Sequence, residues 1–584
     1  MKVLRRIWRS PITTAVLGVL FVLSFLSAIY YHVNVFTAGV VVLSNIPVNT
    51  VTIPETGNIV GEVPGNVVTV PTAEMVQGQN VWLPQATKLL EENEGRLTQI
   101  YQRVYTTKLA TSVIFEGLGS VEEAQRVISA LRANTGLGTF FVTREQLATE
   151  IRTIEVLIRA GEQMGILVDP GVMGSTELMC NLLESIDILR NTYGYAGAIV
   201  LRPVLGIATE ALLECGSALG CAVVSHTFQA VPETVWQKGN VETIAELVFT
   251  ESMPSLQRGG IALFEMGVFS RDEVLGDYVR HVIGTRNPYP VVPVTDVIMD
   301  TGVQYIYPLP ERMILDTVRN AVYPGHTTYA NVMQKIANGY IGLAEQNKDT
   351  LMPGFTYLER ESMNTKGLVR NEDEQVFLTF QGWGSDTAVE AILAVLEKHN
   401  AHATFFLQTE LAAANPNLVR GIAADGHDIG TMTHTGQPLA IGLDSDTRFV
   451  EINATESDAL REDVLLSYDT LMHICGDMTS NSGKPSLTSY LRPPNLAVSR
   501  RGLEVVMDLG ITYCVLGSYD CEDDEAKRAM DLANEMRKNT QSGSVLILRL
   551  SDDCLYTAEA LDRYLMRIES DKHYRFVGLS MALR

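Results

Sequence analysis

The sequence predicts an α/β protein built on parallel sheets, because strand-like and helix-like segments alternate along most of its length. Residues 111–117 ("TSVIFEG") and 138–142 ("GTFFV") are typical of buried strands, and 121–134 between them is typical of an amphipathic helix. A second helix signal at 144–161 and a strand signal at 194–204 continue the series. The same series returns in the last third of the chain, which predicts two such sheets in tandem.

The repeat keeps a constant spacing, which favours internal duplication over two unrelated α/β segments that share generic signals. Subtracting 265 from positions in the second series superposes three motifs. Further along, the offset becomes 290, and we assign the extra residues to an insertion in the polar segment 442–463. The matched positions are Phe380 with Phe115, Thr404 with Thr139, Gly426 with Gly161 and, at the larger offset, Arg492 with Arg202.

The N-terminus predicts a membrane anchor. Four basic residues within the first nine positions precede an uncharged apolar run at 11–31, which has the length of about 20 residues that a spanning helix needs. A cleaved signal peptide, with "LSA" at 26–28 as its cleavage site, is the alternative, but the apolar run is longer than the usual h-region. We therefore expect a signal anchor, with the N-terminus cytoplasmic and the bulk of the chain outside the plasma membrane.

The charge of the chain limits the partners that it can bind, and its cysteines limit the kinds of site that it can contain. Beyond residue 32 the chain carries 41 basic and 68 acidic residues, so this part is strongly acidic. Such a body is repelled by nucleic acid and by anionic lipid headgroups, and it suits a neutral or cationic partner, although solubility alone also explains the charge. The seven cysteines contain no CxxC pair, which argues against a disulfide framework or a cysteine-based zinc site.

Composition predicts five regions. They are a cytoplasmic tip and transmembrane signal anchor at 1–32, a stalk and helical lead-in at 33–107, a first domain at 108–285, a Pro-rich linker at 286–370 and a second domain at 371–584. Two acidic stretches near the end, 521–539 and 551–565, are typical of a solvated helix and of helix capping respectively.

The second copy contains an ordered set of motifs: "LTFQGWGSD", "HATFFL", "GHDIGTMTHTGQPL", "YLRPPN" and "GSVLILRL". With these motifs each copy resembles the polysaccharide deacetylase family, whose unit is the NodB-like carbohydrate esterase domain. The resemblance covers residues 371–584 well and 108–285 more faintly. It implies a distorted (β/α) barrel with its site at the C-terminal strand ends. It also implies hydrolysis of an N-acetyl group on a polysaccharide, with a zinc-like ion held by one Asp and two His.

The residues that the resemblance assigns to catalysis are substituted in both copies. In the second copy, the family's base corresponds to Gln381, its metal-binding Asp to Gly382, its two His ligands to Met432 and Gly436, and its late His to Arg549. In the first copy, the corresponding residues are Glu116, Gly117, Leu167, Gly171 and Glu265. The arginines of the "RP" motif, Arg492 and Arg202, are retained. Glu116 and Glu265 could do acid–base work, but no metal triad surrounds them.

A relocated metal site is the alternative to an empty one. Asp386, His427, Asp428 and His434 lie near the substituted positions in the sequence. Asp386 also fits the start of a helix, where Ser385 and Asp386 are both good N-cap residues. Trp383 has two interpretations as well: it could stack on a sugar ring, or it could be a lid packed on its own domain.

The sequence therefore predicts a membrane-anchored, extracytoplasmic protein with two deacetylase-like domains that have lost catalysis and bind a glycan or a partner protein. The first alternative is an active metal-dependent hydrolase of carbon–nitrogen bonds, with His434, Asp386 and Glu116 as relocated site residues. The second is a structural role in which one domain supports assembly of the other. We expect no cofactor, or zinc only if the site is relocated. The expected partners are the membrane and cell-wall glycan or an envelope protein, and we expect no nucleic acid.

Overall fold

The computed structural model describes residues 80–250, 253–300, 304–323, 329–371, 373–444, 448–571 and 574–583. All of them fall within one compact unit, Thr69–Arg584. Within these ranges, no helix combines the length and the apolar character needed to cross a membrane. The predicted anchor at 1–32 and most of the predicted stalk lie outside the described residues.

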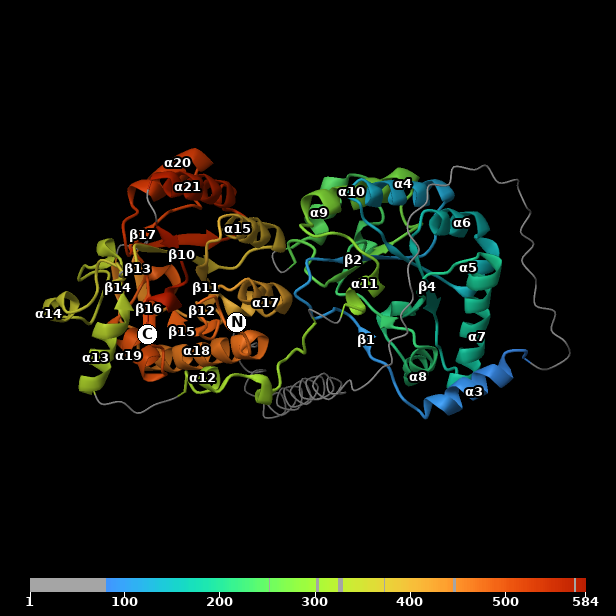
Figure 1. The fold of residues 1–584 in the computed structure, drawn as a ribbon, viewed down its shortest axis with the longest axis horizontal. Coiled ribbons are helices and arrows are strands. Elements are labelled where there is room, and N and C mark those ends of the chain that lie inside the picture. Colours follow the sequence, from blue (N-terminus) through green and yellow to red (C-terminus); the bar gives the residue numbers. More distant parts are fainter. Residues whose placement is uncertain are drawn as a thin grey trace, which may run out of the picture. The chain divides into compact units, whose positions relative to one another are not determined.

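The first domain is built on a parallel sheet with the strand order β1-β6-β5-β4-β3-β2-β8-β7 (Figure 1). Its strands are β1 (Ile100–Tyr101), β2 (Ser112–Glu116), β3 (Thr139–Val142), β4 (Gln163–Val168), β5 (Val200–Pro203), β6 (Val223–Val224), β7 (Phe228–Gln229) and β8 (Ile261–Glu265). Its helices are α3 (Leu83–Asn93), α4 (Val121–Arg132), α5 (Arg144–Thr149), α6 (Ile151–Arg159), α7 (Ser175–Asp187), α8 (Glu210–Leu219), α9 (Val241–Val248), α10 (Asp272–Thr285) and α11 (Val294–Ile298). Because parallel strands need long crossovers, helices separate most of these strands in the sequence.

The second domain repeats this sheet with the order β9-β16-β15-β12-β11-β10-β18-β17. Its strands are β9 (Tyr340–Ile341), β10 (Gln375–Gly382), β11 (Ala403–Leu407), β12 (Asp428–Thr431), β15 (Leu487–Leu491), β16 (Tyr513–Val515), β17 (Tyr519–Asp520), β18 (Val545–Leu550) and β19 (Arg575–Phe576), which also pairs with β10. Its main helices are α13 (Tyr329–Gly339), α15 (Asp386–Lys398), α16 (Thr409–Ala412), α17 (Pro416–Ala424), α18 (Ala454–Cys475), α19 (Arg500–Asp508), α20 (Ala529–Lys538) and α21 (Thr557–Asp571).

The two sheets confirm the predicted duplication strand by strand. Phe115 of β2 lies opposite Phe140 of β3, with their stacked ring centroids 4.4 Å apart. Phe380 of β10 lies opposite Phe405 of β11 in the same way, with the centroids 5.0 Å apart. The predicted α/β class is therefore correct, and each sheet is a curved, parallel half-barrel.

The predicted insertion at 442–463 corresponds to a hairpin and a longer helix. The hairpin consists of β13 (Ile441–Asp444) and β14 (Arg448–Val450). Helix α18, which follows it, has 22 residues, whereas its counterpart α7 has 13. These additions account for the change of offset between the copies.

Residues 286–370 contribute elements to both domains. Helix α11 packs against the first domain, and β9 is the edge strand of the second sheet, paired with β16. The helix pattern from 329 onwards stops at Gly339 and continues as β9. A Cβ atom at Gly339 would lie 2.3 Å from the Thr512 carbonyl oxygen, so only glycine allows this close approach.

Side chains alternate between the two faces of each strand, which sends one set into the sheet's concave side. In β10, Val376, Leu378 and Phe380 join the large core between strands and helices, whereas Phe377 joins a separate inner cluster. By this alternation, Gln381 lies on the inner face at the C-terminal end of β10. Glu116 follows Ile114 on the inner face of β2 in the same way.

The N-terminal ends of both sheets are closed by equivalent polar contacts with a later segment of the same domain. In the second domain, Asp428 of β12 accepts from the Ser580 hydroxyl at 2.7 Å. In the first, Gln163 of β4 donates to the Thr295 hydroxyl at 2.8 Å. The 265-residue offset relates Asp428 to Gln163. These polar residues therefore have the same structural role in both copies, at the end of the sheet opposite the expected site.

Candidate functional site

The family positions of the second domain gather at the C-terminal strand ends. Gln381 and Gly382 end β10, and Gln381 lies opposite Arg549 of β18. Met432 follows β12, and its N–H donates to the Leu407 carbonyl at the end of β11 at 2.8 Å. The fold thus brings the substituted base, ligand and late positions to the same edge of the sheet.

The two glycines at metal-ligand positions have a backbone conformation that suits glycine. Gly382 has φ +93° and Gly436 has φ +85°, both in the left-handed region that L-residues with a Cβ rarely adopt. The corresponding Gly117 and Gly171 of the first domain also have positive φ, at +76° and +46°. In both copies, the backbone at these positions matches the absence of a ligating side chain.

A carboxylate holds the loop that follows β12. Asp463 of α18 accepts from the backbone N–H of His434 at 2.5 Å and from that of Thr435 at 3.0 Å. It also accepts from the Thr435 hydroxyl at 2.6 Å. The His434 ring is used locally, because its Nδ1 lies 2.9 Å from the Thr409 hydroxyl. The loop is therefore ordered by hydrogen bonds from a neighbouring helix.

Arg549, at the late-histidine position, forms a cluster with acidic residues at the end of β17 and directly after it. Its Nη1 lies 2.8 Å from Asp520 and 3.2 Å from Asp523, and its Nε lies 3.3 Å from Asp524. Burial alone would lower the pKa of Arg549, but hydrogen bonding and the charge of Asp520 raise it above its usual value. The prediction of a solvated helix at 521–539 was wrong for its first part, since α20 begins only at Ala529 and Asp523 is buried.

Arg492 is fully buried and has no carboxylate partner among the described residues. Its Nη2 donates to the Thr379 hydroxyl at 2.7 Å, its Nε donates to the Val515 carbonyl at 3.0 Å, and its guanidinium lies over the Phe406 ring. Burial lowers the pKa of Arg492 to about 9. The Gln381 amide oxygen is also buried without a hydrogen-bond partner in the described part of the chain.

The first domain has an ion pair at the corresponding place, the C-terminal ends of its strands, which we call the corner of the sheet. Arg202, which is 1% exposed, donates from Nε to Glu116 at 2.7 Å. Its Nη2 donates to His226 Nδ1 at 3.2 Å, and burial followed by the charge of Arg202 lowers the pKa of His226 to about 4. His226 is therefore neutral near pH 7 and carries its proton on Nε2.

Glu265 lies next to this pair. It is opposite Glu116 on the adjacent strand, and its Oε1 accepts from Gln229 at 2.8 Å. Burial and then the nearby charge of Glu116 raise the pKa of Glu265 above its usual value. The first domain therefore has two neighbouring carboxylates, of which one is paired with an arginine and the other with a neutral amide.

Asp386 lies away from this corner. It is the first residue of α15, after the N-cap Ser385, whose side chain accepts from the Ala388 N–H. Its carboxylate is 2% exposed and accepts from the Tyr289 hydroxyl at 2.7 Å and the Arg258 N–H at 2.9 Å. Both partners belong to the segments around β8 and α10, so Asp386 ties the second domain to residues of the first.

His427 also lies elsewhere. It precedes β12 at the N-terminal end of the sheet, is 3% exposed, and its Nδ1 accepts from the Ala403 N–H at 3.3 Å. Burial lowers the pKa of His427 to about 3, so the ring stays neutral. Glu162 of the first domain accepts from the Gly138 N–H at 2.6 Å in the equivalent place. This role is structural in both copies.

These residues do not fit a bound metal ion. Gly382 and Gly436 offer no side-chain ligand, and Asp386, His427, Asp428 and His434 are distributed over three separate regions of the domain. Across the described ranges, no group of three or more His, Cys, Asp or Glu side chains is arranged to hold a metal. We therefore derive no metal-dependent step from this site.

The loop 380–386 ("FQGWGSD") is held as a structural turn. Ser385 donates its backbone N–H to Asp552 at 2.9 Å, and the two side chains are also hydrogen-bonded. Trp383 is half-buried and packs against the core of its own domain. Asp552 was expected to cap a helix, but it instead holds the turn that leads into α15.

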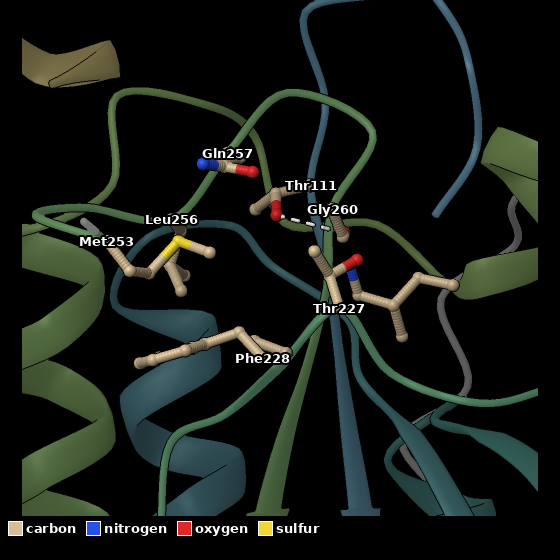
Figure 2. A pocket seen from close by; sticks show the side chains of 9 residues that line it. Thr111, Thr227, Phe228, Met253, Leu256, Gln257 and Gly260 are labelled. Atoms are coloured by element: carbon tan, nitrogen blue, oxygen red, sulfur yellow. Dashed lines mark hydrogen bonds between the residues drawn. The ribbon is translucent and has the colours of Figure 1, made fainter. Parts of the chain in front are cut away.

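A small pocket lies at the opposite end of the first domain. It is formed at the N-terminal ends of β2, β7 and β8, where Phe228, Met253 and Leu256 supply apolar walls (Figure 2). The Thr111 hydroxyl donates to the Gly260 carbonyl at 3.2 Å beside it. No titratable side chain lines this pocket, so it offers no acid–base chemistry.

Fold and site together define a pair of deacetylase-like α/β half-barrels. Residues 369–514 match the family model described as polysaccharide deacetylase. Residues 369–514 thus carry the polysaccharide deacetylase domain that the sequence motifs predicted. The first domain repeats its strand order.

Curated relatives agree with this assignment. A chitooligosaccharide deacetylase of Azorhizobium caulinodans is 28% identical over 186 residues, which cover 32% of this chain and 77% of the relative. A peptidoglycan-N-acetylglucosamine deacetylase of Bacillus cereus is 27% identical over 227 residues, covering 38% of this chain and 73% of the relative.

Solved structures with some similarity include a peptidoglycan N-acetylglucosamine deacetylase with a TM-score of 0.31 at 23% identity, covering 37% of this chain and 91% of that structure. Another is a CE4-family pseudoenzyme from Bacillus anthracis with a TM-score of 0.30 at 19% identity, covering 37% of this chain and 67% of that structure.

Proposed function

We propose that this chain is a membrane-anchored, extracytoplasmic deacetylase-like protein that binds glycan without hydrolysing it. The observation that carries the proposal is the state of the C-terminal strand ends. Gln381 cannot take up a proton near neutral pH, and Gly382 and Gly436 have no ligand atoms. The anchor rests on the basic and apolar sequence of residues 1–32.

Neighbouring side chains at the strand ends act structurally. Asp463 orders the loop after β12, and Arg549 is neutralised by Asp520 and Asp523. A catalytic site needs groups that are free to exchange protons or to bind substrate. In the second domain Asp463 and Arg549 are instead engaged in contacts within the protein, whereas the buried Gln381 amide oxygen has no hydrogen-bond partner in the described part of the chain, and neither arrangement supplies acid–base chemistry.

The alternative of an active metal-dependent hydrolase of N-acetyl groups requires His434, Asp386 and Glu116 to act together. His434 bonds to Thr409, Asp386 contacts Tyr289, and Glu116 belongs to the other domain, where it pairs with Arg202. This arrangement gives the alternative no support from geometry. The partly buried carboxylates Glu116 and Glu265 lie side by side in the first domain, and this is the observation that favours acid–base chemistry there.

Acetate release tests the absence of hydrolysis. The purified chain should release no acetate above background from N-acetylglucosamine oligomers or peptidoglycan, with or without added zinc. Release that disappears in Glu116→Gln would support hydrolysis in the first domain. Release that disappears in His434→Ala would support a relocated site in the second. Either result would overturn the non-catalytic proposal.

Retention on insoluble cell-wall polymer tests glycan binding. We expect the full chain to be retained and to be displaced by soluble oligomers of the same polymer. Failure to bind any wall polymer would contradict glycan binding and favour the structural role. Trp383→Ala should bind like the unmodified chain, because Trp383 packs against its own domain rather than facing a ligand.

A further inference from the structure

We propose that the C-terminal strand ends of the first domain bind a sugar with a free, protonated amine. The site consists of an acidic floor, formed by Glu116, Glu265 and Arg202, and an apolar rim, formed by Val172, Leu205 and Ile207. The inference rests on the proposed glycan binding and names the chemical class of the ligand. No hydrolysis is required of the site.

The acidic floor carries more negative than positive charge. Arg202 neutralises Glu116, whereas Glu265 has only the neutral amide of Gln229 as a partner. Glu233, which is exposed, adds a further negative charge near Glu265. A cationic ligand group next to Glu265 would neutralise this carboxylate. A partly buried carboxylate is stabilised by a charged hydrogen-bond donor.

The floor also has free hydrogen-bonding capacity. Glu116 and Glu265 each use one carboxylate oxygen in the contacts described, which leaves one oxygen apiece for a donor outside the protein. His226 is neutral, its Nδ1 faces Arg202, and its Nε2–H is thus available to an acceptor. An ammonium group flanked by hydroxyls matches this set of two acceptors and one donor.

The apolar rim follows the two adjacent strands β4 and β5. The exposed fractions are 105% for Val172, 81% for Leu205 and 73% for Ile207. Val172 and Ile207 lie in loops and Leu205 lies in a short 3-10 helix, Val204–Gly206. All three follow the C-terminal ends of these strands, on the same edge of the sheet as the floor. Apolar side chains around a few polar groups are typical of small-molecule sites, and they suit the C–H faces of a sugar ring.

The loop after β5 distinguishes the rim from the corresponding loop of the second domain. Leu205 has φ +61°, a conformation that is uncommon for leucine. The second domain has the same conformation at the matching position, φ +55°, but there the residue is Asn495, which tolerates it well. The next residue of the second domain, Leu496, is also a leucine with positive φ, at +53°, but its side chain is buried. The feature that distinguishes Leu205 is therefore the exposure of its side chain, which the proposed ligand would cover.

Two oligomers of equal length distinguish amine recognition from general glycan binding. The probes are a hexamer of glucosamine with all amines free and the fully N-acetylated hexamer, titrated calorimetrically into the purified full chain at pH 6. We expect the free-amine hexamer to bind at least tenfold more tightly. Equal affinities, or preference for the acetylated hexamer, would overturn the amine inference but leave the proposed glycan binding intact. Binding of neither hexamer would overturn the amine inference, and glycan binding would then depend on the polymer-retention test.

Charge variants locate the amine. Glu265→Gln should weaken binding of the free-amine hexamer at least fivefold and leave the weak binding of the acetylated hexamer unchanged. The matched control is Glu246→Gln, which removes the same charge from an exposed position on α9 and should leave affinity unchanged. Equal weakening by both variants would show that overall charge, rather than this floor, attracts the amine.

Leu205→Asn separates function from folding at the rim. It installs the residue that the second domain uses in the same backbone conformation, so the melting temperature should stay the same or rise. Affinity for the free-amine hexamer should fall at least threefold. A lower melting temperature with unchanged affinity would show that Leu205 is structural and would remove the rim from the site.

Discussion

The two domains share a strand order but differ in the residues that stand at the family's catalytic positions, at the C-terminal strand ends. The first keeps an ion pair there, between Glu116 and Arg202, and places a second carboxylate, Glu265, beside it. In the second domain, Gln381 stands in place of Glu116 and Arg549 in place of Glu265, and Arg492 has no carboxylate partner among the described residues. The C-terminal strand ends are therefore acidic and partly exposed in the first domain, whereas in the second domain Arg549 is paired with Asp520 and Asp523.

The largest expected effect on stability comes from replacing Glu116 of the first domain by glutamine, the residue at the matching position of the second domain. Glu116→Gln leaves Arg202, which is 1% exposed, without its carboxylate. We expect the free energy of unfolding to fall by about 3 kcal/mol, because the variant breaks a buried ion pair. We take the lower end of the usual range, since Glu116 is partly exposed. Calorimetric unfolding should show a lower melting temperature for the first domain. An unchanged melting temperature would mean that the ion pair between Glu116 and Arg202 does not stabilise the first domain.

Asp463→Asn tests whether a carboxylate has taken over the ordering of the loop after β12. The variant weakens the hydrogen bonds to the His434 and Thr435 backbone and to the Thr435 hydroxyl. We expect a loss of about 2 kcal/mol, because hydrogen bonds to a charged group contribute more than neutral ones. Amide hydrogen exchange of residues 434–436 should accelerate. Exchange at the unmodified rate would contradict the assigned role.

Asp386 gives the contact between the domains a pH dependence. Burial raises the pKa of Asp386 from 3.8 to about 6. Because the folded state holds the proton more tightly than the unfolded chain, this carboxyl group stabilises the fold more as pH falls through 6, and the gain is lost as pH rises. Between pH 7 and 5 the unmodified chain should gain about 1 kcal/mol relative to Asp386→Asn. Parallel stability–pH curves would contradict this account.

The reverse exchange, Gln381→Glu, should have the smallest effect. It places a carboxylate on the inner face of β10, at the corner that contains the buried Arg492. Attraction to the arginine is offset by the cost of burying the new charge, so we expect a gain of about 0.5 kcal/mol. A melting temperature lowered by several degrees would show that the second corner cannot accommodate the charge pair of the first.

Most of the fold was predictable from the sequence, because alternating strand and helix signals and a constant repeat spacing are local patterns. Ser385 as a helix cap and Phe115 and Phe380 as matched core residues follow from those patterns. The predicted helical lead-in before residue 108 is helical only in part: α3 ends at Asn93, and β1 follows, paired with a strand over 120 residues later in the chain.

The candidate site was less predictable, because its partners are distant in sequence. The resemblance identified the substituted positions, but nothing local indicated that Asp386 contacts Tyr289, 97 residues away. Asp463 lies in the insertion, where the first copy offers no counterpart for comparison. The acidic residues that bind Arg549 were assigned to a helix face, because charge order alone does not separate a capped helix from a loop that supplies ion-pair partners.

The absence of metal chemistry is the central claim, and zinc binding tests it most directly. Titration of zinc into the purified, metal-stripped chain, followed by calorimetry and elemental analysis, should show no stoichiometric binding at micromolar protein. Gln381→Asp combined with Gly382→Asp, Met432→His and Gly436→His should serve as the comparison chain with the family's ligand set. One tightly bound zinc per unmodified chain, lost in His434→Ala, would contradict the account.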